Sequence, residues 1–270
     1  MLVFLLACAS PRQDIESTAD WDDVGSLLEV IEPVSFTDTP YDFPADPGAG
    51  IGAFIDAVFP VSEGSIAFGS SDQFGSGTDC TSLVSDDLPW EVEAVVTLHP
   101  RYYFKTSGCD IASDEKYYGS YFVEDATGGV FVLGDSRVAH FDIGTKVRIS
   151  LRGARTAYDL DMIYAHDIVA IERDVVHPVY YTEAIDSLGS ADVGEVRRVT
   201  GTVISEKSTF GDFEVEADDG IIHTISLDAE LSRRGVGFDI GTRIQATGPV
   251  ILSYDVYSIV IMRVGQTQTL

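Results

Sequence analysis

Basic residues are scarce in this 270-residue chain, which has 17 Lys and Arg against 44 Asp and Glu and a formal net charge of −27 at pH 7. Before Arg101 the only Lys or Arg is Arg12. A negative field of this size repels polyanions before any local contact forms. The composition therefore disfavours nucleic acid as a partner.

Long hydrophobic runs are also absent, and without a stretch of about 18 apolar residues we expect no membrane-spanning helix. The sequence has no Gly-x-Ser-x-Gly elbow, no HxH or HExxH spacing and no EF-hand-like run of aspartates. Its five histidines lie on separate segments, at His99, His140, His166, His177 and His223. We therefore expect no catalytic residues, no metal and no cofactor.

The chain begins with a short apolar run that ends in Leu5-Leu6-Ala7-Cys8. This run resembles the end of a bacterial lipoprotein signal, with a lipobox at residues 5–8. The resemblance implies cleavage before Cys8, a diacylglycerol on its thiol and a lipid anchor in the bacterial cell envelope. Ala9 resembles the residue choice of lipoproteins that reach the outer membrane. The alternative is a disordered apolar N-terminus with an incidental cysteine.

Beyond this signal remnant, residues 9–86 are expected to form an acidic and mostly irregular tether. Three short elements are expected within it: an amphipathic helix at Trp21–Ile31, an apolar element at Gly48–Pro60 and a strand at Ser65–Phe68.

Residues 87–175 and 176–270 each contain five short runs of β-branched and aromatic residues, separated by Gly and Asp turns. In the first half the predicted strands are Val92–Leu98, Tyr117–Val123, Val130–Leu133, Lys146–Leu151 and Met162–Ile171. In the second half they are Glu195–Ser205, Asp212–Ala217, Ile221–Leu227, Arg243–Gly248 and Tyr257–Val264.

Two cysteines besides Cys8 are present, Cys80 and Cys109, and both lie in polar segments. In an oxidising compartment they can form one disulfide, which would attach the segment before the first half to it. The alternative is a pair of free thiols. Two cysteines supply too few ligands for a structural metal site.

The two halves resemble each other in sequence. FDIGT occurs at 141–145 and again at 238–242, and each copy is followed by a basic residue, Lys146 or Arg243. Ahead of each copy, a strand-like run leads through an acidic, Gly-containing turn into a second run. We interpret this pattern as an internal duplication.

The run YFVEDATGGVFV at 121–132, followed by FDIGTKVRI at 141–149, resembles the OB-fold modules of secreted bacterial nucleases and envelope lipoproteins. The resemblance implies an all-β chain with two small five-stranded OB-like Greek-key barrels in tandem. It also implies that the two barrels are accessory domains, and it does not imply an enzymatic activity.

The best aromatic and basic cluster for ligand binding comprises Arg101, Tyr102, Tyr103, Lys105, Tyr117 and Tyr118. Binding of a single strand needs stacked aromatics together with a basic groove. Asp110, Asp114 and Glu115 lie nearby in the sequence and weigh against such a groove. The alternative is that these aromatics cap the barrel.

These features together predict a non-catalytic, lipid-anchored envelope module that binds a protein or a glycan, or that serves a structural role. The alternative is a pair of accessory domains that present substrate to an envelope nuclease or hydrolase and bind oligonucleotides weakly. The oligomeric state stays open.

Overall fold

The computed structural model describes residues 34–42, 50–58, 66–67, 80–81, 90–98, 101–106, 117–133, 141–157, 160–172, 175–228, 231–232, 234–253 and 255–270. Pro33–Leu270 form one compact unit. Cys8, Cys109 and the expected helix at Trp21–Ile31 lie outside the described residues, whereas Cys80 lies in the short strand β3 (Cys80–Thr81). The lipid anchor and the disulfide therefore stay predictions.

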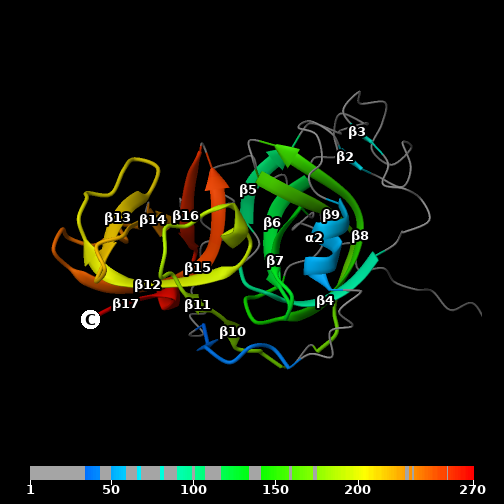
Figure 1. The fold of residues 1–270 in the computed structure, drawn as a ribbon, viewed down its shortest axis with the longest axis horizontal. Coiled ribbons are helices and arrows are strands. Elements are labelled where there is room, and N and C mark those ends of the chain that lie inside the picture. The colour runs from blue at the N-terminus through cyan, green and yellow to red at the C-terminus, as the bar shows by residue number, and fades with distance from the viewer. Residues whose placement is uncertain are drawn as a thin grey trace, which may run out of the picture. The chain divides into compact units, whose positions relative to one another are not determined.

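Five strands form a barrel in the first half of the chain (Figure 1). They are β4 (Trp90–Val96), β6 (Tyr117–Glu124), β7 (Gly129–Leu133), β8 (Lys146–Ala157) and β9 (Leu160–Ala170). Their hydrogen-bonded order is β8-β4-β6-β7-β9, and β8 also pairs with β9, so the sheet closes on itself. Only the β7–β9 pair of this barrel is parallel. This is the arrangement of the OB fold, and it confirms the predicted fold class.

The second half repeats the same arrangement. Its strands are β12 (Val196–Val203), β13 (Asp212–Ala217), β14 (Ile222–Leu227), β15 (Arg243–Ser253) and β16 (Val256–Ile261). The order is β12-β13-β14-β16-β15, closed by pairing of β12 with β15, and β14 runs parallel to β16. Each of the ten predicted strands therefore exists, with ends that differ from the prediction by at most six residues.

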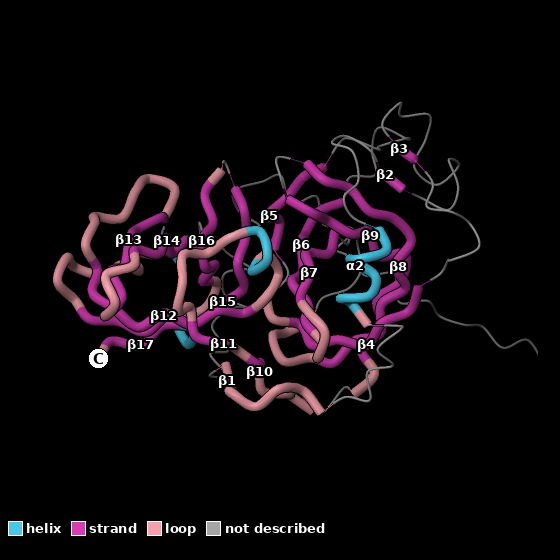
Figure 2. Tube along the Cα trace, in the orientation of Figure 1, coloured by secondary structure: helices cyan, strands magenta, loops and turns pink. Residues whose placement is uncertain are grey.

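Short elements complete the described structure. Figure 2 shows that strands and loops make up most of it, with helix confined to brief segments. The remaining elements are β1 (Phe36–Thr37), α2 (Ile51–Val58), β2 (Ile66–Ala67), β5 (Arg101–Thr106), β10 (Val179–Tyr180), β11 (Thr182–Glu183), η2 (Ser190–Asp192), η3 (Val264–Gln266) and β17 (Thr267–Thr269). Among the described residues, no helix is long and apolar enough to cross a membrane.

Each barrel encloses its own apolar core because alternate residues of a strand point inward. In the first barrel Val92, Ala94 and Val96 of β4 are buried together with residues of the other strands. In the second barrel Val199 and Val203 of β12 take part in the same way. The period-two pattern of the sequence thus fixes which face of each strand is buried.

Helix α2 fills one end of the first core, although it comes from the predicted tether. Ile51 and Phe54 are fully buried there. The Ile51 N–H donates to Asp125 Oδ2 at 2.8 Å, and the Gly52 N–H donates to Thr127 Oγ1 at 2.9 Å. Because free N–H groups at a helix start need acceptors, the β6–β7 turn caps this helix.

The FDIGT repeat closes both barrels through the same hydrogen bonds. The Gly144 N–H donates to the Val96 carbonyl at 2.8 Å, and the Val96 N–H donates to the Thr145 carbonyl at 2.9 Å. The second copy repeats both bonds, at 2.8 and 2.9 Å, between Gly241, Thr242 and Val203. Gly144 and Gly241 have φ of +88° and +89°, a conformation that glycine adopts without strain. The internal duplication therefore extends to backbone geometry.

A smaller apolar cluster lies where the two barrels meet. Val95 and Ile143 of the first barrel are buried against Val179 and Val196. Strand β1 pairs in parallel with β10 beside this cluster. Arg263 is hydrogen-bonded to Asp142 and adds an ion pair between the barrels.

Glu124 lies buried at this junction, with 4% of its surface exposed. Its Oε2 has no partner among the described residues. Burial, followed by the nearby Glu195 carboxylate, raises the pKa of Glu124 to about 9, although the Val196 N–H and Arg197 act in the opposite direction. Glu124 is therefore protonated at neutral pH in the folded chain.

His223 is a buried polar residue of the second barrel. It is 2% exposed on β14, and neither ring nitrogen has a partner among the described residues. Burial lowers the pKa of its imidazole. In the first barrel Val130 occupies this place, since Val130 pairs with Val123 as His223 pairs with Val215.

We expect Glu124→Gln to remove a pH dependence of folding. The folded chain holds a proton that the unfolded chain releases, so this contribution is full below about pH 4.5 and is lost as the pH rises toward 9. Between these limits the protonated Glu124 should make the free energy of unfolding fall by about 1.4 kcal/mol per pH unit. In Glu124→Gln the fall per pH unit should be smaller, because the titrating carboxyl is gone. Urea unfolding from about pH 5 to 9 measures both slopes. Identical slopes would contradict this assignment.

We expect His223→Val, which introduces the residue of the first barrel, to flatten the acid side of the stability profile. Because the folded-state pKa of His223 is lowered, its contribution is full above the unfolded pKa of about 6.5 and is lost as the pH falls through the folded-state value. The free energy of unfolding of the parent and of the variant, each measured at about pH 7.5 and 5.5, gives the pH dependence of each protein. A variant as acid-sensitive as the parent would show that another group is responsible.

Candidate functional site

A groove of about 920 Å³ opens on the outer face of the second barrel. Its walls are the 204–211 loop between β12 and β13, the strands β13 and β14, and the ends of β15 and β16. The lining residues are Ser205, Glu206, Ser208, Phe210, Asp212, Phe213, Glu214, Thr224, Ser226, Ile251, Val256 and Ser258. OB folds use this same region, strands two and three between the first and last loops, to hold ligands.

The strand register places four lining residues in one row. Glu214 lies opposite Thr224, Thr224 opposite Ser258, and Ser258 opposite Ile251. Because side chains at paired positions share a face of the sheet, the row crosses the groove from β13 to β15. The floor thus combines a carboxylate, two hydroxyls and an aliphatic side chain.

The 204–211 loop is held by its own hydrogen bonds. Ser205 Oγ accepts the Glu214 N–H at 2.8 Å, and Ser208 Oγ accepts the Asp212 N–H at 3.0 Å. Lys207 Nζ donates to the Val236 carbonyl at 2.6 Å and to the Ser232 carbonyl at 3.2 Å. These bonds attach the loop to both the strand and the 231–237 segment.

Phe210 stands at the tip of this loop with 82% of its surface exposed. Gly211 follows it with φ of +101°, and its N–H donates to the Ser208 carbonyl at 3.1 Å. The tight turn therefore presents an aromatic ring to solvent at the edge of the groove. Sequence analysis missed Phe210, although the signal was a single aromatic within a turn-rich stretch between two predicted strands.

The groove is acidic where it is polar. The Ser226 hydroxyl donates to Asp212 Oδ1 at 2.7 Å, which fixes that carboxylate against β14. Glu214 is exposed, and its carboxylate has no partner among the described residues. Neither Lys nor Arg is among the described lining residues. The described lining residues therefore offer no positive charge to a phosphate, and Lys207 of the loop donates to two backbone carbonyls instead.

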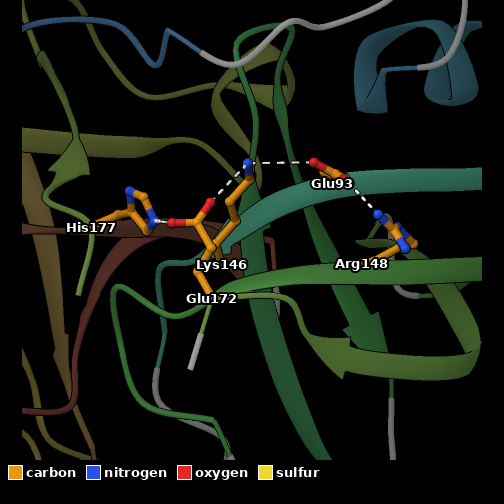
Figure 3. A network of polar contacts seen from close by, with 5 residues as sticks. All are labelled: Glu93, Lys146, Arg148, Glu172 and His177. Atoms are coloured by element: carbon orange, nitrogen blue, oxygen red, sulfur yellow. Dashed lines mark hydrogen bonds and ion pairs between the residues drawn. The ribbon is translucent and has the colours of Figure 1, made fainter. Parts of the chain in front are cut away.

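A second polar cluster lies on the first barrel (Figure 3). Lys146, with a side chain 10% exposed, lies 3.4 Å from both Glu93 and Glu172. Arg148 pairs with Glu93 at 2.7 Å, and His177 contacts Glu172 at 3.0 Å. The His177 hydrogen bond, with Lys146, lowers the pKa of Glu172. The cluster joins β4 and β8 to the segment after β9, and each member already has a charged partner, so it serves structure.

The structure brings the sequence-predicted ligand residues onto two neighbouring strands. Arg101–Thr106 forms β5, which pairs with β6, so that Arg101 lies opposite Ser120 and Lys105 opposite Tyr118. Strand β5 is inserted between β4 and β6 in the sequence, at the position where the second barrel has the 204–211 loop. The side chains of Arg101, Tyr102, Tyr103, Lys105, Tyr117 and Tyr118 lie outside what the structure describes, so their role stays a prediction.

No protein-family model matches this sequence, and no curated protein matches it. Several solved structures resemble it. The second OB-fold domain of replication protein A from Methanococcus maripaludis is 19% identical, with 33% of this chain and 89% of that chain covered and a TM-score of 0.25. The single-stranded DNA binding protein from Thermus aquaticus is 10% identical, with 67% and 91% covered and a TM-score of 0.23.

The Stn1–Ten1 complex of S. pombe is 14% identical, with 28% of this chain covered and a TM-score of 0.23. This chain spans only 57% of the length of that one. With TM-scores this low, the OB-fold assignment rests on strand order and register.

These matches correct two expectations from the sequence. Because they include a single-stranded DNA binding protein and a replication protein, the envelope module with a protein or glycan ligand is wrong as the leading interpretation. The expectation that nucleic acid is disfavoured as a partner is contradicted as well. The physical reason is that bases can stack on one local face of an OB fold, and net charge does not describe that contribution.

We expect Lys207→Met to loosen the groove loop without unfolding the barrel. The substitution removes both bonds to the carbonyls of Val236 and Ser232 while retaining the length of the side chain. Amide hydrogen exchange at 208–212 should then speed up by about tenfold, the effect of roughly 1.4 kcal/mol. Arg243→Met, which removes a contact of the same barrel with Asp218, is the control. Unchanged exchange in the loop would show that the lysine does not hold it.

Proposed function

We propose that this chain is a non-catalytic binding protein whose second barrel holds a single-stranded oligonucleotide in the groove. The observation that carries the proposal is the exposed Phe210 ring at the edge of an OB-fold groove. An aromatic side chain so exposed contributes little to folding, since its surface stays in water. Its position is explained by a ligand with a flat face.

Bases of a single strand have such faces. Stacking of a base on an aromatic side chain contributes about 1 to 3 kcal/mol and tolerates any sequence. The neighbouring hydroxyls of Thr224 and Ser258 can hydrogen-bond with either donors or acceptors on a base. The groove volume of about 920 Å³ lies within the range of about 300 to 1,000 Å³ found for ligand sites.

Binding is favoured over catalysis by the chemistry of the walls. The described lining residues include neither His nor Cys. Two of the serines accept backbone N–H groups, and the Asp212 carboxylate is hydrogen-bonded to Ser226. A hydroxyl nucleophile needs an adjacent base, and Ser226, the lining serine that donates to a carboxylate, is itself buried. Such a module would present a strand to a separate nuclease or hydrolase.

The net charge of −27 sets the expected strength of binding. Contacts to phosphate supply much of the affinity of most nucleic-acid binding proteins. A groove whose described lining residues include no cation forgoes much of that contribution, so we expect weak, micromolar or poorer affinity carried by stacking.

We expect Phe210→Ala to weaken binding of a mixed-sequence single-stranded DNA of about 12 nucleotides, within the span that OB folds cover. Loss of one stacking contact corresponds to a dissociation constant about 5- to 150-fold higher. Fluorescence anisotropy of a labelled strand measures it.

Ile240→Ala is the matched control, because Ile240 is a 58% exposed apolar residue of the same barrel outside the groove lining. Equal affinities of the parent and Phe210→Ala would overturn the proposal, as would the absence of any binding by the parent.

A further inference from the structure

Five cations of the second barrel have contacts to other groups in the part of the chain that the structure describes. Lys207, in the groove loop itself, donates to two backbone carbonyls. Arg243 forms two bonds with Asp218, at 2.7 and 2.6 Å. The others with described partners are Arg197 with Asp192 and Glu195, Arg198 with Thr247 and the Tyr181 ring, and Arg263 with Asp142. Since the described lining residues include no Lys or Arg either, the groove offers a ligand contacts other than ion pairs with phosphate.

Carboxylate acceptors dominate the polar part of the groove. Glu214 is exposed on β13 and lies opposite Thr224 of β14. The same wall holds Asp212, whose Oδ1 is occupied by Ser226. Glu206 adds a third carboxylate from the loop. A carboxylate only accepts hydrogen bonds, so the groove favours a ligand edge that donates.

We propose, on the basis of the oligonucleotide binding proposed above, that the groove holds the bases of the strand and prefers those with an exocyclic amino group. The cytosine N4 amino group donates to a carboxylate, whereas thymine presents the O4 acceptor at the same place. Two acceptors facing each other repel and leave a desolvated group without a partner. Glu214 is the residue that makes this distinction.

The same carboxylates orient the strand. Phosphates are repelled by Glu206, Asp212 and Glu214, while a base can stack on Phe210 and place its edge against the row of Glu214, Thr224 and Ser258. The sugar-phosphate backbone then lies on the solvent side of the groove. Acidic walls thus select against the backbone and in favour of the donating base.

The experiment compares oligodeoxycytidylate with oligodeoxythymidylate, both of about 12 nucleotides, by fluorescence anisotropy with the full chain. We expect the cytidylate to bind about tenfold more tightly. The two strands carry the same number of phosphates, so the ratio of their affinities should not change with salt. Glu214→Gln should lower the ratio to near one, because the glutamine amide can also donate to thymine O4.

Glu216→Gln is the matched control, since Glu216 is exposed on the same face of β13 but outside the groove lining. Both substitutions remove one negative charge, so a general electrostatic effect would raise both affinities equally in both variants. A ratio of affinities near one in the parent, or a ratio that Glu214→Gln leaves unchanged, would overturn this inference. The proposed function would still stand if both strands bound in a way that depends on Phe210. Binding of neither strand would overturn the proposed function itself.

Discussion

Closure of each barrel depends on one backbone contact between the first and fourth strands. The glycine of FDIGT, with φ near +88°, directs its N–H to the last residue of the first strand. That contact sets the register of β4 with β8 and of β12 with β15. Since side chains alternate along a strand, the register then decides which residues enter the core and which form the outer face.

The groove follows from this closure. Once β12 and β15 are paired, β16 lies between β15 and β14, and Glu214, Thr224 and Ser258 fall into one row. The loop that carries Phe210 joins β12 to β13 and is held by Lys207. The described cations of this barrel are engaged in internal contacts. The groove therefore offers a ligand mainly hydroxyls, carboxylates and the exposed ring of Phe210.

The strands were predictable because their signal is local. Period-two alternation and Gly or Asp turns located all ten barrel strands, and the repeated FDIGT motif indicated two copies of one fold. The candidate site was harder to predict from the sequence. Phe210 resembles any aromatic residue in a loop, and only its 82% exposure beside a groove distinguishes it. The charge of the whole chain led away from nucleic acid because it carries no information about a single face.

The sequence by itself determined the all-β class, the duplication and the inward face of each strand, since these depend on residues adjacent in the chain. Tertiary structure alone decided that α2 closes the first core and that Glu124 and His223 are buried without full pairing. It also decided that Glu214 lies beside Thr224 and Ser258. These features join residues far apart in the sequence, and no local pattern specifies which distant partners barrel closure will bring together.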